Sequence, residues 1–309
     1  MRRLLAVLLA VLFAALAAGC ATAPAGGPAR GAAPGYLGGA TLDVPNADAL
    51  RRRIWVPGLD EGYVPQGLAS APGGVLYVSA YRPMPDLKAN GGPCRVFRVD
   101  AASGAVTGRF DVPPGACTHA GGLVLVGPGR LLLADTRRLF LIDLARALAS
   151  GGTEGAARTL KLGGALRGAY AAFDGRDPWI GTWTREPGAA RMYRLPASLF
   201  DTLDGQTISE AQALESLPVP LEAQGAAFDR EGGLWLSASN GRWARLYRLD
   251  RQGQVRAGYP MVPGLEGLAV DEAGRLWSLS ESGARKYLHW AARFPFVFQI
   301  DTARLRAAP

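Results

Sequence analysis

Histidine, cysteine and lysine are all scarce in this 309-residue sequence. The two histidines are His119 and His289, and the three cysteines are Cys20, Cys94 and Cys117. Two histidines far apart in the chain favour neither a histidine-rich metal site nor a serine, histidine, aspartate relay, and no G-x-S-x-G nucleophile elbow occurs. The formal net charge is +8, but the arginines are scattered among apolar residues and lysine occurs only three times. We therefore expect no nucleic-acid partner.

Only one long apolar run is present, and it lies at the N-terminus. Arg2 and Arg3 precede fifteen apolar residues, 4–18, which are followed by Gly19 and Cys20. This run is too short to span a bilayer comfortably and has the charged start and small-residue end of a signal peptide. We expect residues 1–19 to be removed on export. The alternative is an ordinary secretory peptide that happens to contain a cysteine.

The residues that end at Cys20 resemble the bacterial lipobox, with Ala17 where the usual leucine stands. The resemblance implies that the Cys20 thiol carries fatty acids such as palmitate, so that the protein is a lipoprotein held to a membrane without a spanning helix. Ala21 replaces the aspartate that, by resemblance to the sorting rule of Gram-negative lipoproteins, retains a protein at the inner membrane. We expect a cell-envelope location, at the outer membrane facing the periplasm.

After the cysteine, sixteen of the twenty residues 21–40 are Ala, Gly or Pro. Such a segment has no periodic apolar face to bury and behaves as a flexible tether. The expected organisation is a signal peptide at 1–19, a lipidated tether at 20–40 and one folded domain at 41–309.

The folded part repeats a pattern of strand, glycine-containing turn and second strand, and 41 glycines and 22 prolines are spread along the chain. An irregular period of 40 to 55 residues is typical of propeller blades. The strand pairs are expected at 67–81, 122–136, 171–183, 226–239 and 267–281. Third strands, with alternating apolar and polar residues, are expected at 94–100, 137–143, 190–196, 244–250 and 296–301. Trp55, Trp179, Trp235 and Trp277 occupy strand positions and are expected to pack between blades.

Outer strands are expected at 106–113, 158–164, 214–220 and 255–263, and the fifth unit has none of its own. The segment 54–60 matches 260–266 in pattern, so a strand around residues 53–57 is expected to complete the last blade and close the ring. The predicted fold is therefore all-β: a single β-propeller with five blades. The alternatives are a sandwich and a sixth, degenerate blade hidden in 144–165 or 197–220, although 144–151 and 208–214 read as short helices.

Six polar residues precede or begin the innermost strands, which places them at one end of the axial channel. Convergent polar groups in a concave channel mouth are typical of a ligand site, so these residues are the candidate ligand-binding set, with the loop 82–92 at the rim. The alternative is that they only satisfy backbone groups and channel water. The set comprises Gln66, His119, Arg167, Glu222, Gln224 and Glu266.

The residues 266–271, followed by Gly274 and Leu276-Trp277, resemble the blade signature of the regucalcin and gluconolactonase (SMP-30) family and of NHL-repeat propellers. In the lactonases, a glutamate, an asparagine before glycine and an aspartate hold one divalent metal. The resemblance transfers only the glutamate, Glu266, as a metal ligand. Gln66 and Gln224 stand where the asparagine before glycine is expected, and glutamine carbonyls suit calcium better than a catalytic zinc.

Two function classes follow from these patterns. The first is a non-catalytic envelope propeller that binds a small molecule, a glycan or a protein partner at its axial face. The alternative is a lactonase-like hydrolase that depends on one divalent cation, with calcium as the candidate. No catalytic residue is assigned, since metal content decides between the two classes.

Cys94 and Cys117 are the two cysteines left in the exported domain. An even pair in an oxidising compartment is more often bonded than free, so a disulfide between them is expected. The alternative is a reactive thiol pair.

Overall fold

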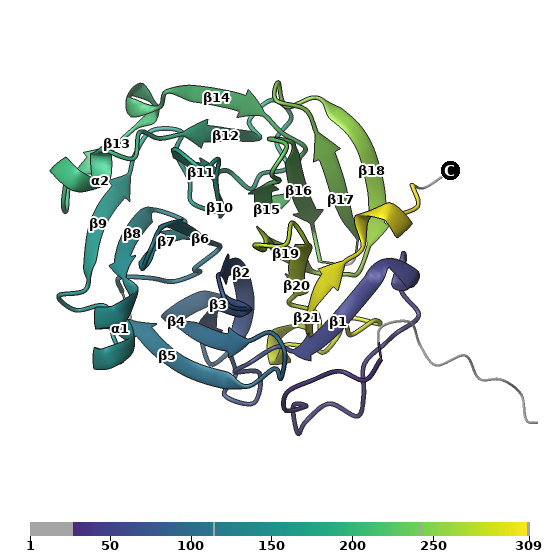
Figure 1. The fold of residues 1–309 in the computed structure, drawn as a ribbon. Coiled ribbons are helices and arrows are strands. Elements are labelled where there is room, and N and C mark those ends of the chain that lie inside the picture. Colours follow the sequence, from purple (N-terminus) through teal and green to yellow (C-terminus); the bar gives the residue numbers. More distant parts are fainter. Residues whose placement is uncertain (1–26, 114, 242, 308–309) are drawn as a thin grey trace, which may run out of the picture.

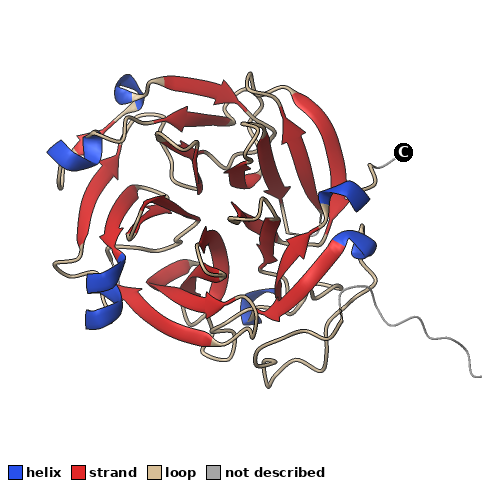
Figure 2. Cartoon of the chain, viewed as in Figure 1, coloured by secondary structure: helices blue, strands red, loops and turns tan. Residues whose placement is uncertain are grey.

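Short strands separated by glycine-containing turns build the whole molecule. The computed structural model describes residues 27–113, 115–241 and 243–307. These residues form five sheets arranged as blades around a central axis, so the protein is a five-bladed β-propeller (Figure 1, Figure 2). The predicted fold class and blade number are confirmed. The expected signal peptide and the expected lipidation site, Cys20, lie outside the described residues. Within the described part no helix is long and apolar enough to cross a membrane.

In each blade the first strand lies at the axis, and the following strands pair antiparallel outward from it. The outermost strand of the last blade comes from the N-terminal part of the chain. Blade 1 contains β2 (Val64–Ala71), β3 (Val75–Pro83), β4 (Asn90–Asp100) and β5 (Val106–Val112). Blade 2 contains β6 (Gly122–Gly127), β7 (Arg130–Asp135), β8 (Arg138–Asp143) and β9 (Ala157–Leu162). Blade 3 contains β10 (Tyr170–Phe173), β11 (Pro178–Gly181), β12 (Arg191–Arg194) and β14 (Glu215–Pro218). Blade 4 contains β15 (Ala223–Phe228), β16 (Leu234–Ser239), β17 (Ala244–Leu249) and β18 (Val255–Met261).

Blade 5 joins the two ends of the chain. It contains β19 (Leu265–Val270), β20 (Leu276–Ser280) and β21 (Phe296–Ile300), and β1 (Leu50–Trp55) pairs antiparallel with β21 as the outer strand. The predicted closure by the N-terminal segment is confirmed, with the strand beginning at Leu50 rather than near 53. Residue Arg30 adds a parallel bridge to β1, so part of the expected tether lies against this blade. Because the first and last strands of the chain pair with each other, no strand edge is left unpaired where the ring closes.

Short helices lie in the connections within blades and near the chain ends. The helices are α1 (Leu144–Ser150), α2 (Leu199–Thr202), η1 (Ala47–Ala49), η2 (Glu210–Gln212), η3 (Arg285–Tyr287) and η4 (Thr302–Arg304). Two of them, α1 and η2, lie at the predicted places 144–151 and 208–214. The segment near 208 also contributes β13 (Thr207–Ile208), which pairs parallel with β9 and widens blade 2 instead of starting a sixth blade. The core lies between the blades, where the strand tryptophans pack as expected: Trp179 contacts Phe228, and Trp277 is fully buried.

A carboxylate organises the turn between the first two strands in blade 5. Asp271 Oδ1 accepts hydrogen bonds from the backbone of Ala273 and Arg275 at 2.9 Å each, and Asp271 Oδ2 accepts from Trp277 Nε1 at 2.9 Å. One side chain thus satisfies the turn and fixes the indole that follows it, as an Asx turn does. Asp174 does the same for Trp179 in blade 3. These turns lie at the end of the blades opposite the predicted ligand-binding residues.

Candidate functional site

The axial face is the end of the propeller at which the innermost strands begin. Because neighbouring strands are antiparallel, the second strand of each blade ends on this same face, as the pairing of Val64 with Tyr81 in blade 1 shows. The loops that join second and third strands therefore surround the axial mouth. The expected rim loop at 82–92 is one of them, and the long connection 281–295 in blade 5 is another.

Three polar residues of the predicted set reach the axis from β-bulges. The ladder between first and second strands shifts register beside Gln66, Gln224 and Glu266, each of which precedes a glycine. A bulge re-aims a side chain at the cost of one ladder position. The glycine is required because the next blade is in contact: a Cβ on Gly267 would lie 2.5 Å from the backbone nitrogen of Leu68.

The buried centre of the axial face is a pair of carboxyl groups, Glu266 and Glu281, which hydrogen-bond to each other. Glu266 is 1% exposed and Glu281 is 6% exposed. Gln224 Nε2 donates to Glu266 Oε1 at 3.0 Å, and Gln66 Nε2 donates to Glu281 Oε2 at 2.9 Å. Blades 1, 4 and 5 thus contribute to one hydrogen-bonded row. Glu266 and Glu281 are here called the acid pair, and Gln66 and Gln224 flank it.

Burial raises the pKa of both carboxyls, because the charged forms lose their hydration. The pKa of Glu266 lies well above its ordinary value, first through burial and then through the negative charge of Glu281. Burial raises the pKa of Glu281 to about 7, although the hydrogen bonds from Gln66 and Tyr287 and the charge of Lys286 act in the opposite direction. Both shifts favour the protonated forms, so the two carboxyls tend to share a proton instead of both being ionised.

Aromatic and cationic side chains lie beside the acid pair. Lys286 Nζ donates to the hydroxyl of Tyr81 and to Asn90 Oδ1, both at 2.9 Å, and lies 5.2 Å from the centre of the Tyr81 ring. Burial lowers the pKa of Lys286, and the charge of Glu281 acts against this. Tyr287 interacts with the hydroxyl of Tyr81 and with Glu281, and burial raises its pKa far above the ordinary value. Lys286 thus lies within the field of the acid pair but outside ion-pair distance of it.

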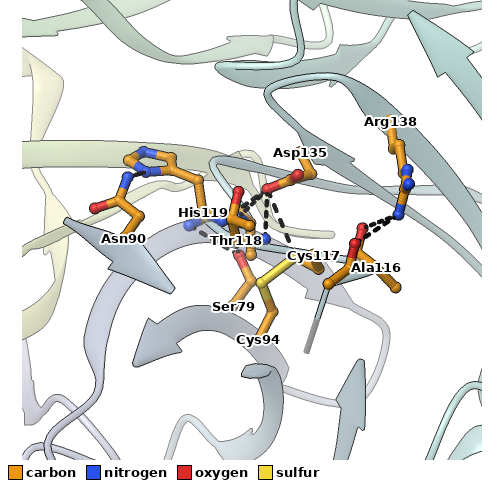
Figure 3. Close-up of a disulfide and its surroundings, with 12 residues drawn as sticks. Ser79, Asn90, Cys94, Ala116, Cys117, Thr118, His119, Asp135 and Arg138 are labelled. Carbon is orange, nitrogen blue, oxygen red and sulfur yellow. Dashed lines mark hydrogen bonds between the residues drawn. A yellow bond between two sulfur atoms is a disulfide. The ribbon is translucent and has the colours of Figure 1, made fainter. Parts of the chain in front are cut away.

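His119 joins this group through Asn90 (Figure 3). Asn90 Nδ2 lies 2.6 Å from His119 Nδ1, and the imidazole stacks on Tyr81 with 5.1 Å between ring centres. Burial lowers the pKa of His119 to about 4, and Lys286 also lowers it while Asp135 raises it. The ring is therefore neutral at pH 7, so Nδ1 accepts from Asn90 and Nε2 carries the hydrogen.

The segment that carries His119 is fixed by one carboxylate. Asp135, at the end of β7, accepts hydrogen bonds at Oδ1 from the backbone nitrogens of Thr118, His119 and Ala120 at 3.2, 2.7 and 3.1 Å (Figure 3). The histidine backbone is thereby held at the start of blade 2. The imidazole position depends on this short segment rather than on a strand.

The remaining two residues of the predicted set do not reach the acid pair. Arg167 Nη1 donates to the backbone oxygens of Gly164 and Leu166. Glu222 pairs with Arg185 at 2.8 Å and has a φ of 61°, a backbone conformation that is uncommon for glutamate. The structure therefore places Gln66 and Gln224 in hydrogen-bond contact with the acid pair, of which Glu266 is one member. His119 is linked to this group through Asn90. Arg167 and Glu222 have local partners.

Cys94 and Cys117 form the predicted disulfide, with 5.8 Å between their Cα atoms (Figure 3). The bridge ties β4 in blade 1 to the segment that leads into blade 2. These two sulfurs and Asp135 lie close enough together to resemble a metal site. The thiolates that such a site needs are consumed by the S–S bond, so the oxidised protein offers no metal-binding thiolate here.

Sequence reasoning missed Glu281, Tyr81, Lys286 and Tyr287. Tyr81 and Glu281 close the second-strand segments 67–81 and 267–281, so antiparallel pairing alone predicts that they face the same axial mouth as Gln66 and Glu266. Lys286 and Tyr287 lie in the insertion between β20 and β21, which no other blade repeats. Nothing in the repeat pattern indicates their position.

The clefts in the described part of the molecule lie away from these polar residues. One of about 540 Å³ follows the seam between the N-terminal segment and blade 1, beside Trp55 and Phe97. Another, of about 180 Å³, lies at the opposite mouth of the channel and is lined by the apolar ends of the innermost strands, Phe173 and Phe228 among them. Neither contains convergent ionisable groups at a buried position. A further cleft, of about 570 Å³, lies between blades 3 and 4 at the end opposite the axial face and is lined by charged side chains, Asp174, Arg194 and Arg230 among them. Unlike these clefts, the axial face holds two ionisable groups, Glu266 and Glu281, side by side at buried positions.

The fold and the axial face define a five-bladed β-propeller whose channel mouth carries a buried acid pair. Comparison with known proteins adds the fold alone. No family model and no curated protein matches the sequence.

Similar solved structures are propellers of several kinds. The calcium-binding protein regucalcin from Agrobacterium tumefaciens is 17% identical, with a TM-score of 0.42, over 81% of this chain and 93% of the other. The PQQ-bound aldose sugar dehydrogenase from Streptomyces coelicolor is 15% identical, with a TM-score of 0.45, over 76% and 93%. Virginiamycin B lyase from Staphylococcus aureus is 12% identical, with a TM-score of 0.39, over 74% and 80%.

Proposed function

We propose that this protein is a lipid-anchored propeller of the bacterial cell envelope that binds a small polar ligand through the acid pair on its axial face. The observation that carries the proposal is the burial of Glu266 and Glu281 side by side. In the described part of the chain neither carboxyl forms an ion pair, and Lys286 acts on Glu281 only from a distance. A ligand that donates hydrogen bonds or carries positive charge would supply what the pair lacks.

The energetic argument rests on the cost of burying carboxyl groups. Burying an ionised carboxylate without a partner costs several kcal/mol, and a pair of apolar side chains of similar volume would avoid the cost. Gln66 and Gln224 donate one hydrogen bond each to the pair, which leaves acceptor capacity on both carboxyls. Retaining such a pair at a channel mouth is typical of a binding site.

A divalent cation is the second candidate ligand, and it is favoured by Gln66. The Oε1 atom of this buried side chain has no hydrogen-bond partner among the described residues, although Nε2 has two. Two carboxyls and an amide oxygen form an all-oxygen donor set, which suits calcium better than zinc. Bound there, calcium would supply Lewis-acid chemistry, and the lactonase-like alternative depends on it. Binding calcium would release the shared proton from the acid pair.

The envelope location is supported by the disulfide, because such bonds persist in oxidising compartments. Anchoring through Cys20 follows from the lipobox resemblance. The tether enters the described structure at the edge of blade 5, where Gly27 accepts a hydrogen bond from Arg53.

The test compares Glu266→Gln with the native protein. The substitution keeps the shape and removes the ionisable group, so affinity for a ligand that contacts the pair should fall by about 1.5–3 kcal/mol, roughly ten- to a hundredfold. Calcium chloride is the probe for the cation, by isothermal titration calorimetry, and thermal-shift screening with polyols and amines is the probe for organic ligands. Glu231→Gln, an exposed glutamate at the opposite end of blade 4, is the matched control. Probes that shift the native protein and Glu266→Gln equally would contradict the proposal.

A further inference from the structure

Large apolar side chains are exposed unevenly over the surface. Among the residues that the structure describes, eight are exposed, and five of them lie in connections on the axial face: Met84, Leu87, Trp183, Leu221 and Trp243. An uneven distribution of this kind marks an interaction site, whereas single scattered residues do not.

The two tryptophans lie in connections of adjacent blades that are joined by hydrogen bonds. Trp183 follows β11 in blade 3 and is 38% exposed, and Trp243 precedes β17 in blade 4 and is 68% exposed. Trp183 Nε1 donates to the backbone oxygen of Ser239 at 3.2 Å, and the next residue, Asn240, donates from its backbone nitrogen to the backbone oxygen of Trp243 at 3.3 Å. The indole of Trp183 is therefore held in a fixed position across the boundary between the blades. Together, Trp183 and Trp243 are here called the indole platform.

The ion pair between Arg185 and Glu222 lies beside Trp183. The Arg185 guanidinium lies 5.4 Å from the centre of the Trp183 ring and donates from Nε to Glu222 Oε1 at 2.8 Å. The backbone nitrogen of Glu222 donates to the backbone oxygen of Thr184 at 3.0 Å, which fixes the glutamate against the same loop. Hydrogen-bond donors and acceptors thus lie at the edge of an exposed aromatic surface.

The indole platform lies beside the start of the strand that carries Gln224, whose side chain donates to the acid pair. Glu222 stands two residues before Gln224, whose side chain donates to Glu266. The backbone nitrogen of Ser239, whose oxygen holds Trp183, donates to the backbone oxygen of Glu222 at 2.9 Å. A ligand that covers Trp183 and extends along the start of β15 would therefore meet the half-buried Gln224, which donates to Glu266.

We propose that the indole platform and the acid pair together bind a saccharide chain. The apolar C–H face of a sugar ring packs on an exposed indole, while its hydroxyl groups donate to carboxylates and accept from guanidinium groups. An organic cation fits this surface less well, because Arg185 already places positive charge over Trp183. This inference rests on the proposed function, since it places one end of the saccharide at the acid pair.

The experiment measures binding of cellotetraose and chitotetraose to the purified protein, by calorimetry and by quenching of tryptophan fluorescence. Trp183→Ala and Trp243→Ala should each weaken binding tenfold or more. Trp183→Phe keeps an aromatic face but loses the Nε1 hydrogen bond, so it should retain most of the affinity. Leu214→Ala, which removes another exposed apolar side chain at the outer edge of blade 3, should bind as the native protein does. Circular dichroism and melting temperature establish that each variant is folded.

The binding measurements separate the saccharide inference from the proposed function. Absence of binding by both sugars at millimolar concentration would overturn the inference, as would equal binding by native protein and both alanine variants. Calcium or polyol binding that depends on Glu266, without sugar binding, would overturn this inference and leave the axial site in place. Sugar binding that needs the tryptophans but is unchanged in Glu266→Gln would contradict the proposed function and would confine the saccharide to the indole platform. Capture of a protein partner that competes with neither sugar would count against a saccharide.

Discussion

At the scale of single residues, the axial face depends on one shared proton. Glu266 and Glu281 come from two neighbouring strands of blade 5 and approach closely enough to hydrogen-bond, which two ionised carboxylates would not do. Their titration therefore belongs to the pair rather than to either residue. The state of that proton sets the charge of the acid pair and contributes to the stability of the fold.

Glu281→Gln tests this coupling through the pH dependence of stability. The native pKa of about 7 lies above the ordinary value of 4.5, so the folded state binds more protons than the unfolded state between these two pH values. The free energy of unfolding contributed by Glu281 is therefore complete below pH 4.5 and is lost as the pH rises through 7. Relative to Glu281→Gln, the native protein should lose roughly 1–3 kcal/mol across this range, measured by urea denaturation.

The difference between the two proteins is the informative quantity, because His119 contributes with the opposite sign. Its pKa falls from 6.5 to about 4 on folding, so its contribution is present above pH 6.5 and is lost as the pH falls through 4. Both proteins share this contribution. If the difference in the free energy of unfolding between the native protein and Glu281→Gln stays constant with pH, folding does not raise the pKa of Glu281.

At the scale of elements, the repeat pattern predicted which strands exist but not all of the residues that their ends bring together. Alternating apolar residues and glycine turns gave the strand segments of all five blades, because a half-buried strand has a period of two. Gln66, Gln224 and Glu266 were found because each precedes a glycine at the start of an innermost strand. Arg167 and Glu222 occupy comparable positions, but their local partners, a pair of backbone oxygens and Arg185, are set by loops without a repeat.

The long connection of blade 5 shows where sequence reasoning ends. Lys286 and Tyr287 lie in η3, a single turn that has no periodic pattern, and they reach blade 1 through Tyr81. Contacts of this kind between distant segments depend on tertiary packing rather than on local propensity. The same reason explains why Asn90, in the expected rim loop, could be placed on the axial face but not beside His119.

The Cys94–Cys117 bridge joins two blades, and its removal should weaken the boundary between them. The bond closes a loop with a sequence separation of 23 residues. Replacing both cysteines by alanine should lower the free energy of unfolding by about 3 kcal/mol in the chain-entropy account. Urea denaturation of the double variant measures the loss, and the native protein in reductant should lose a similar amount. Two free thiols titrated in the denatured, unreduced native protein would contradict the bond.

At the scale of the whole molecule, attachment and folding are separate properties. The propeller is complete without residues 1–26, whereas the proposed anchor is Cys20. Cys20→Ser should therefore move the protein from the membrane fraction to the soluble fraction and leave its melting temperature unchanged. Cell fractionation with immunoblotting measures the first effect, and mass spectrometry of the native protein should detect the acyl chains. A serine variant that stays with the membrane would show that another segment holds it there.

The closure of blade 5 constrains when the molecule can fold. Its outer strand, β1, is the first strand of the chain and pairs with β21, the last. For a polypeptide that crosses a membrane with its N-terminus leading, β1 emerges first and finds its partner only after the C-terminus has been released. Blades 1 to 4 draw their strands from within 64–261 and can assemble in order as they emerge, since contacts between nearby segments form faster than distant ones. The last blade then acts as a check on completeness, because a chain truncated before β21 leaves its leading strand unpaired and the ring open.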